Sequence, residues 1–417
     1  MIVKGGAVLN GEVATGGAKN SALKLLFAAL LAEGEHIFHN VPDLHDIIAT
    51  GQLLQSLGCE MTRDGNTIRL KVTKPKSMEA HYDLVRKMRA SILCLGPLLT
   101  KYGEAVVSLP GGCAIGSRPI DLHLEGMKAL GAEIELKDGY VHARAKRLKG
   151  AHFLFEISTV GGTENVMMAA ALAEGRTVLE NAAKEPEIVD LAMYLNAMGA
   201  KIKGYGTSVI EIEGVEKLKP AEYSVMPDRI EAGTLIIAGA ITGGEVTVKK
   251  MVPEHVDSLL FKLREAGFKL SIGPDSVTVH PQKGWKAVDI TTQPYPFFPT
   301  DLQAQFMALM TVAEGTSVIS ESVFENRFMH VQELTRLGAD ISPKTRVAVV
   351  RGKPGGLSGA PVMATDLRAS ASLVLAGLVA KGETTVNRIY HLDRGYEKLE
   401  AKLASLGGQV LRQGGSV

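Results

Sequence analysis

The chain of 417 residues is poor in cysteine and in aromatic residues. It has three cysteines, Cys59, Cys94 and Cys113, and no Cys-x-x-Cys pair. An odd number of widely spaced cysteines argues against a disulfide framework and against a thiolate zinc site. Aromatic residues make up 5% of the chain, which leaves few rings on which nucleic-acid bases could stack. We therefore expect reduced thiols and no nucleic-acid partner.

Net charge and long apolar runs are also nearly absent. The chain has 46 Lys and Arg and 45 Asp and Glu, so the formal net charge is +1. This charge does not indicate binding to nucleic acid or to an anionic membrane. The longest apolar runs, residues 25–32 and 235–242, fall far short of the ~20 residues that span a bilayer. No basic stretch followed by an apolar segment marks a secretory signal at the N-terminus. We expect a soluble, cytoplasmic protein without membrane insertion.

What the sequence does have is an internal repeat of about 70 residues. A short Leu-rich signature recurs six times, and each copy is closed by a glycine suited to the C′ position of a helix. These glycines are Gly58, Gly131, Gly199, Gly267, Gly338 and Gly407. An Ala/Leu-rich segment with its own terminal glycine precedes each of them by 23 to 28 residues. This second set is Gly34, Gly103, Gly175, Gly244, Gly315 and Gly382.

Each copy contains two helical segments of different character. The first is apolar nearly all round, which predicts a buried helix; examples are residues 167–172, 235–241, 304–312 and 373–379. The second is amphipathic and is expected at the surface, as at residues 256–266 and 396–406. With the alternating strands, each copy is predicted to be β-α-β-α-β-β. A parallel solenoid is possible, but the six buried helices better fit two inside-out α/β barrel-like domains of three copies each. We place these domains at residues 20–227 and at residues 1–19 plus 228–417.

One loop, residues 110–119, carries a thiol among glycines and between prolines. Glycines let the backbone approach a ligand closely, and prolines fix the ends of the loop. Arg118, five residues after Cys113, would favour the thiolate and bind a nearby anion. The alternative is a small apolar cysteine in a turn.

Basic residues stand at or near the starts of several predicted helices. The positive end of a helix disfavours a cation by about 0.3–1 kcal/mol, so cations there make sense where an anion must be held. The residues are Lys19, Arg89, Arg118, Arg229, Arg327, Arg368 and Arg394. The alternative is that some of them form salt bridges with the neighbouring acids Asp228, Glu325, Asp366 and Asp393.

Several familiar sites are missing from the sequence. The glycine pairs match neither a nucleotide P-loop nor a dinucleotide fingerprint. His81, His123, His330 and His391 show no metal-ligand spacing, and His123 and His330 are expected to cap or pack rather than to catalyse. No Gly-x-Ser-x-Gly elbow occurs. We expect neither a metal nor a cofactor.

Eight segments resemble the enolpyruvyl transferases of the UDP-N-acetylglucosamine 1-carboxyvinyltransferase family, and they extend over the whole chain. They are GGAKNSAL (16–23), KMRAS (87–91), LPGGCAIGSRPIDLH (109–123), PDRIE (227–231), FPTDLQAQF (298–306), FENRFMHV (324–331), ATDLRASAS (364–372) and YHLDRGY (390–396). The family fold consists of two inside-out α/β domains, which agrees with the repeat count. One departure is Gly16, where the family often has serine.

The resemblance implies that phosphoenolpyruvate and UDP-N-acetylglucosamine give a 3-O-enolpyruvyl ether and phosphate, by addition and elimination through a tetrahedral ketal. It implies that Cys113 is the acid on C3, able to form a covalent thioketal and to be alkylated by fosfomycin, and that Asp301 is the base. Lys19, Arg118 and Arg394 match positions that bind the phosphate, and Arg327 and Arg368 match positions that bind the carboxylate or orient Asp301. The remaining substrate contacts are expected from Asn20, Arg89, Pro119, Ile120, Asp121, Leu122, Thr159, Val160, Gly161 and Val323.

Two alternatives remain at this point. The chain resembles the shikimate 3-phosphate enolpyruvyl transferases poorly at the thiol loop, although they share the sixfold architecture. A non-catalytic UDP-sugar-binding paralogue would keep the fold, but the loss of Lys19, Cys113 or Asp301 expected of it is not seen. We expect a monomeric enzyme of peptidoglycan precursor synthesis.

Overall fold

The computed structural model describes residues 1–75, 77–85, 89–109 and 120–413. The chain folds into two units, each with its own hydrophobic core. The N-terminal unit contains the described residues between 17 and 226, and the C-terminal unit contains residues 1–16 and 227–413. Lys19 and Asn20 both belong to the N-terminal unit.

The N-terminal unit contains three copies of the repeat. Its first copy has α1 (Lys19–Ala28), the 3-10 helix η1 (Ala29–Leu31), β3 (Gly34–His39), α2 (His45–Ser56), β4 (Glu60–Asp64) and β5 (Thr67–Val72). The second has β6 (Glu79–Ala80), α3 (Tyr82–Val85), η2 (Arg89–Cys94), α4 (Leu95–Tyr102), β7 (Glu104–Ser108), α5 (Asp121–Ala129), β8 (Glu133–Lys137) and β9 (Tyr140–Arg144). The third has β10 (His152–Leu154), α6 (Val160–Ala170), β11 (Arg176–Glu180), α7 (Pro186–Ala197), β12 (Lys201–Lys203) and β13 (Val209–Glu213), and is followed by β14 (Glu222–Ser224).

The C-terminal unit repeats the pattern. Its first copy has β2 (Gly11–Ala14), α8 (Arg229–Thr242), β15 (Val246–Lys249), η3 (Pro253–Val256), α9 (Asp257–Ala266), β16 (Leu270–Ile272) and β17 (Ser276–Val279). The second has β18 (Ile290–Thr292), η4 (Thr300–Leu302), α10 (Gln303–Met310), β19 (Gly315–Glu321), α11 (His330–Arg336), β20 (Asp340–Pro343) and β21 (Val347–Gly352). The third has β22 (Pro361–Met363), α12 (Leu367–Val379), β23 (Glu383–Asn387), η5 (Ile389–Arg394), α13 (Leu399–Ser405) and β24 (Gln409–Leu411), and is completed by β1 (Ile2–Lys4).

All six sheets in the described part of the chain have four strands in the same arrangement. In the sheet β6-β7-β9-β8, β6 runs parallel to β7, and β7 and β8 each pair antiparallel with β9. The parallel edge strand of the first copy in each unit comes from elsewhere in the sequence: β14 pairs with β3, and β2 pairs with β15. The β-α-β-α-β-β unit and the α/β fold class are confirmed.

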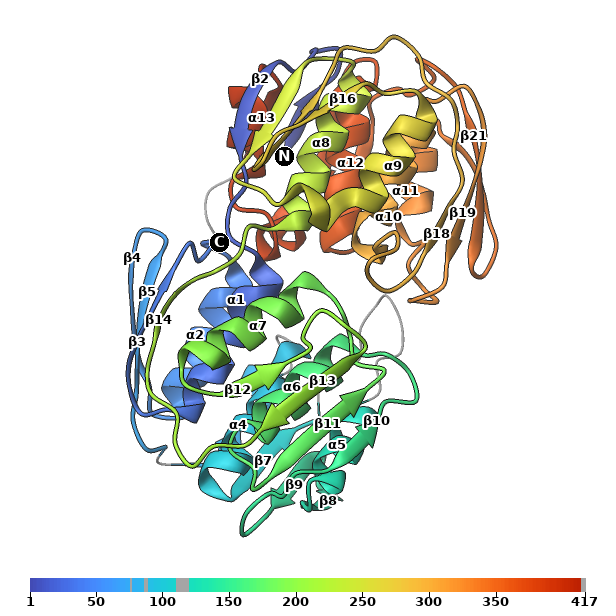
Figure 1. Ribbon diagram of the computed structural model, residues 1–417. Coiled ribbons are helices and arrows are strands. Elements are labelled where there is room, and N and C mark those ends of the chain that lie inside the picture. Colours follow the sequence, from blue (N-terminus) through green and yellow to red (C-terminus); the bar gives the residue numbers. More distant parts are fainter. Residues whose placement is uncertain (76, 86–88, 110–119, 414–417) are drawn as a thin grey trace. The chain divides into compact units, whose positions relative to one another are not determined.

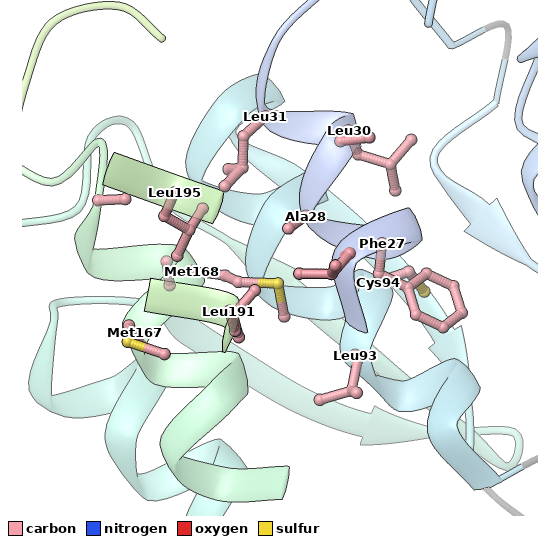
Figure 2. Packing of buried hydrophobic residues seen from close by; sticks show 14 of the residues in the cluster. Phe27, Ala28, Leu30, Leu31, Leu93, Cys94, Met167, Met168, Leu191 and Leu195 are labelled. Carbon is pink, nitrogen blue, oxygen red and sulfur yellow. The ribbon is translucent and has the colours of Figure 1, made fainter. Parts of the chain in front are cut away.

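The helices predicted to be buried form the centre of each unit. In the C-terminal unit α8, α10 and α12 contact one another and lie inside the surrounding strands (Figure 1). Residues 230–241 of α8 are buried without exception, because every face of the helix meets another element. In the N-terminal unit, Phe27 of α1, Leu93 of η2 and Met168 of α6 belong to one buried cluster (Figure 2). Leu191 of α7 belongs to the same cluster, although α7 is the second helix of its copy and was expected at the surface.

The first set of repeat glycines ends helices as predicted, whereas Gly34 and Gly315 of the second set are the first residues of β3 and β19. All six of the first set have positive φ, for example 97° at Gly58 and 105° at Gly267, the left-handed conformation that glycine adopts at little cost. Five of the second set also have positive φ. The exception is Gly244, because α8 ends in a left-handed residue one position earlier, at Gly243.

Within the described residues, every helix is too short or too polar to cross a bilayer.

Candidate active site

Asp301 of the C-terminal unit is bound by two arginines that come from different copies of the repeat. It lies in η4, between β18 and α10. Nη2 of Arg327 is 2.8 Å from its Oδ1, and Nη2 of Arg368 is 2.9 Å from its Oδ2. Nε of Arg368 donates a second hydrogen bond to Oδ2 at 3.2 Å. The side chain of Asp301 is 25% exposed, whereas those of the arginines are 6% and 3% exposed.

The two guanidinium groups decide the charge of Asp301. Burial alone would raise the pKa of this carboxyl group, but Arg368 and then Arg327 outweigh it and hold the pKa well below its usual range. Asp301 is therefore a carboxylate at neutral pH. Both arginines bind Asp301, which is the arrangement expected if they orient this carboxylate, and neither pairs with one of the acids next to it in the sequence. Nη1 of Arg368 is a buried donor with no hydrogen-bond partner among the described residues.

A hydrogen-bonded chain links Arg327 to the segment after β19. Arg327 donates to Thr300 Oγ1 at 3.0 Å, and that hydroxyl donates to Glu321 Oε2 at 2.8 Å. The other oxygen of Glu321 accepts from the backbone amide of Val323 at 2.9 Å. Val323 was predicted to contact substrate, and Glu321 was not singled out because its sequence context carries no signal. This series of hydrogen bonds holds Thr300, Asp301 and Val323 in a fixed arrangement.

The backbone of Asp301 is fixed by a buried amide. Nε2 of Gln305 on α10 donates to the Asp301 carbonyl oxygen at 2.9 Å. The same nitrogen contacts the hydroxyl groups of Thr234, at 3.1 Å, and Tyr396, at 3.0 Å. The ring of Tyr396 also lies 5.3 Å from the guanidinium carbon of Arg368. Residues from three helices and a loop thus set the position of one carboxylate.

The neighbouring acids have other tasks. Asp228 and Asp366 accept hydrogen bonds from backbone amides in the first turns of α8 and α12, so they are N-caps. Asp393 pairs with Arg412, whose Nη2 lies 2.6 Å from its Oδ1. Arg394 is half-buried at the last residue of η5, shortly before α13 begins at Leu399.

In the N-terminal unit, Lys19 is the first residue of α1. Its Nζ lies 2.8 Å from Oδ2 of Asp46 on α2, and both side chains are almost fully buried. The N-cap residue of α1, Ala18, supplies no side-chain acceptor. The start of α1 therefore has uncapped amides beside an ammonium group, a combination that suits an anion. Asn20 follows in the same turn.

The other predicted contacts of this unit stand at three element starts. Arg89 begins η2. Ile120, Asp121 and Leu122 stand at the start of α5. Thr159 caps α6 by accepting a hydrogen bond from the Gly162 amide, and Val160 and Gly161 are the first residues of that helix. Cys113, Arg118 and Pro119 lie outside the described residues.

Comparisons with known proteins decide the family. The family model described as EPSP synthase (3-phosphoshikimate 1-carboxyvinyltransferase) matches residues 3–403. UDP-N-acetylglucosamine 1-carboxyvinyltransferase of Bdellovibrio bacteriovorus is 72% identical over 99% of this chain and 100% of its own length. The protein of the same name from Myxococcus xanthus is 58% identical over 99% of each chain. The chain belongs to the UDP-N-acetylglucosamine 1-carboxyvinyltransferases.

Solved structures agree with this family of enolpyruvyl transferases. The enolpyruvyl transferase NikO from Streptomyces tendae has a TM-score of 0.86 at 28% identity, covering 98% of this chain and 97% of its own. An EPSP synthase from Acinetobacter baumannii has a TM-score of 0.76 at 17% identity and covers 97% of both chains. Because its identity is only 17%, the similarity to this EPSP synthase shows a shared fold and nothing more. The predicted family and its enzyme class are confirmed.

Proposed function

We propose that this chain transfers the enolpyruvyl group of phosphoenolpyruvate to the 3-hydroxyl of UDP-N-acetylglucosamine and releases phosphate. This reaction commits the sugar nucleotide to peptidoglycan precursor synthesis. The observation that supports it best is the carboxylate of Asp301, which two buried arginines hold ionised and oriented, in a chain 72% identical to an enzyme of this name. The proposed enzyme is monomeric and cytoplasmic, and it needs neither metal nor cofactor.

The chemistry requires one acid and one base. C3 of phosphoenolpyruvate takes a proton while C2 takes the sugar oxygen, and the tetrahedral ketal then loses a proton and phosphate. We assign the acid to Cys113, which can also hold the enolpyruvyl group as a thioketal. Asp301 accepts the hydroxyl proton. Because its pKa lies well below the usual range, Asp301 is a weak base whose main contribution is to orient the hydroxyl.

The remaining roles are assigned from the charge of the side chains and from the resemblance to the family. Lys19, Arg118 and Arg394 bind the phosphate of phosphoenolpyruvate. Arg327 and Arg368 orient Asp301, and Nη1 of Arg368 supplies a further buried donor. The UDP-sugar contacts are assigned to Asn20, Arg89, Arg118, Pro119, Ile120, Asp121, Leu122, Thr159, Val160, Gly161, Asp301 and Val323.

The test is phosphate release from phosphoenolpyruvate, with UDP-N-acetylglucosamine or shikimate 3-phosphate as acceptor. We expect turnover with the first acceptor alone, and its loss in Cys113→Ser and Asp301→Ala. Asp340→Ala is the matched control, since Asp340 forms an exposed ion pair with Arg351 at 3.1 Å. Turnover with shikimate 3-phosphate, or binding of the UDP-sugar without turnover, would replace the proposal with one of its alternatives.

A further inference from the structure

A buried asparagine, Asn165, connects three segments of the N-terminal unit. It lies in the second turn of α6 and is fully buried. Its Oδ1 accepts from the Gly96 amide at 2.8 Å, and its Nδ2 donates to the carbonyl oxygen of Ile92 at 3.1 Å. Nδ2 also lies 3.1 Å from Nδ1 of His123 on α5. No role in the proposed reaction has so far been given to Asn165 or His123.

The two backbone partners fix the orientation of the amide group. The Gly96 N–H can only donate and the Ile92 carbonyl can only accept, so Oδ1 and Nδ2 of Asn165 cannot exchange places. The second hydrogen of Nδ2 then points to Nδ1 of His123. Nδ1 of His123 accepts this hydrogen in the tautomer that is neutral and carries its proton on Nε2.

The imidazole of His123 lies against the first turn of α6. A Cβ atom added at Gly161 would lie 3.1 Å from Cε1 and 3.2 Å from Nε2 of His123. A Cβ added at Gly96 would lie 2.6 Å from Oδ1 of Asn165. Glycine at these two positions lets η2, α4, α5 and α6 approach closely around one amide group.

The three connected segments carry most of the predicted UDP-sugar contacts described in this unit, and Asn20 on α1 lies apart from them. Ile92 lies in η2, which begins at Arg89. His123 directly follows Asp121 and Leu122 at the start of α5, and Asn165 follows Thr159–Gly161 at the start of α6. A buried amide with three hydrogen bonds at their junction sets the relative position of all three.

We propose that Asn165 is a positioning residue for the UDP-sugar: its hydrogen bonds fix η2, α5 and α6 against one another and hold His123 as the Nε2–H tautomer beside the first turn of α6. The inference rests on the proposed function, because the ligand is the UDP-sugar of that reaction. Asn165 touches no reacting atom in this scheme. It acts through the segments that it joins.

The first experiment is nitrogen NMR of the unaltered chain labelled with [15N]histidine, with the His123 signals assigned by their loss in His123→Gln. We expect an unprotonated Nδ1 and a protonated Nε2. A protonated Nδ1 in the unaltered chain overturns the inference. Because this measurement needs neither turnover nor an Asn165 variant, its result is separate from that of the proposed function.

The second experiment compares Asn165→Asp with Asn196→Asp. A carboxylate at position 165 has no hydrogen to donate, so the Ile92 carbonyl oxygen and Nδ1 of His123 both lose the donor that Nδ2 of Asn165 supplies. We expect the dissociation constant of UDP-N-acetylglucosamine, measured by calorimetry, to rise about tenfold or more, and that of phosphoenolpyruvate to change by less than about twofold. Asn196 also joins two backbone groups, the amide and carbonyl of Ile202, at 2.9 and 3.0 Å, but lies at the end of α7, away from the predicted contacts.

Unchanged UDP-sugar binding in Asn165→Asp would overturn the positioning role, and so would an equal loss in Asn196→Asp. If Asn165→Asp does not fold, Gly161→Ala provides a second route, because its methyl group would push the His123 ring a few tenths of an ångström while the hydrogen bonds of Asn165 to Gly96 and Ile92 are retained. We expect this variant to weaken UDP-sugar binding, with Nδ1 of His123 still unprotonated. Undiminished binding in Gly161→Ala would contradict the proposed position of the imidazole.

Discussion

Arg368 donates two hydrogen bonds to one carboxylate oxygen of Asp301, from Nη2 at 2.9 Å and from Nε at 3.2 Å. Arg327 binds the other oxygen at 2.8 Å. A carboxylate oxygen can accept more than one hydrogen bond, so Asp301 can still receive a hydroxyl on its exposed side. The arginines give this carboxylate a fixed orientation and a permanent charge, and they reduce its strength as a base.

Replacing Arg368 with methionine is expected to slow the reaction and to change its pH dependence. Arg368 lowers the pKa of Asp301, so its removal raises that pKa toward the ordinary value. Because the carboxylate is the active form, the acid limb of the kcat profile moves to higher pH. We expect kcat to fall on the order of 10- to 100-fold through loss of orientation.

Two variants control this measurement. Arg368→Lys keeps the charge but loses the paired donors, so we expect a smaller movement of the acid limb and a similar loss of kcat. Arg351→Met removes an exposed arginine that pairs with Asp340, and its profile should match that of the unaltered chain. An acid limb that stays in place in Arg368→Met would contradict the role of Arg368 in setting the charge of Asp301.

Lys19 and Asp46 are expected to be coupled in stability but not in activity. Lys19→Met removes the ammonium group 2.8 Å from the nearly buried Asp46 carboxylate, and breaking such a buried pair costs about 3–5 kcal/mol of unfolding free energy. Adding Asp46→Asn removes the buried negative charge as well, so the double variant should regain much of this loss in urea unfolding. Phosphate release should stay abolished in both variants, because the proposed phosphate ligand is missing. Additive stability effects, or recovery of turnover in the double variant, would refute this division of roles.

The fold follows from patterns that are local in the sequence. The run around Leu235 is apolar on every face of a helix, and this is sufficient to place α8 in a core. A glycine after an amphipathic segment, such as Gly267, marks a helix end because few other residues adopt positive φ there. Repetition of both signals six times indicates the architecture without any knowledge of contacts.

The partners within the site could not be predicted in this way. Asp301 is adjacent in sequence to neither Arg327 nor Arg368. The family resemblance pointed to these arginines, but local spacing alone left pairing with nearer acids equally reasonable. The nearby Asp366 is used instead as the N-cap of α12. Asp46 and Asn165 have ordinary helical sequence surroundings, and only the packing of separate helices shows what they contact. Charge pairing between repeats depends on tertiary approach, which no local pattern records.

Fosfomycin is expected to alkylate this chain once, at Cys113. Cys59 and Cys94 are buried, and burial raises the pKa of their thiols to about 11 and about 12, so neither has appreciable thiolate at neutral pH. Peptide mass spectrometry after treatment of the folded chain should show a single adduct. Cys113→Ser should give none, whereas treatment in denaturant with a general thiol reagent should label all three cysteines of the unaltered chain. An adduct on Cys59 or Cys94 under native conditions would show that burial does not protect them.

Glu164 is expected to make the unfolding free energy fall as pH rises. It is fully buried on α6, with Nζ of Lys24 on α1 3.3 Å away; burial raises its pKa from 4.5 to about 7, although Lys24 opposes this. The folded state holds the Glu164 proton more tightly than the unfolded state does, so the protonated carboxyl group contributes to the unfolding free energy. This contribution is complete below about pH 4.5 and is lost as the pH rises through about 7. Its total is at most about 3 kcal/mol. Glu164→Gln keeps the shape and cannot lose a proton, so its stability relative to the unaltered chain should improve between about pH 5 and about pH 8. Urea unfolding at several pH values measures the difference in unfolding free energy between Glu164→Gln and the unaltered chain. The control is Glu213→Gln, because Glu213 forms an exposed pair with Lys201, and it should show almost no difference. A difference for Glu164→Gln that does not vary with pH would rule out the raised pKa.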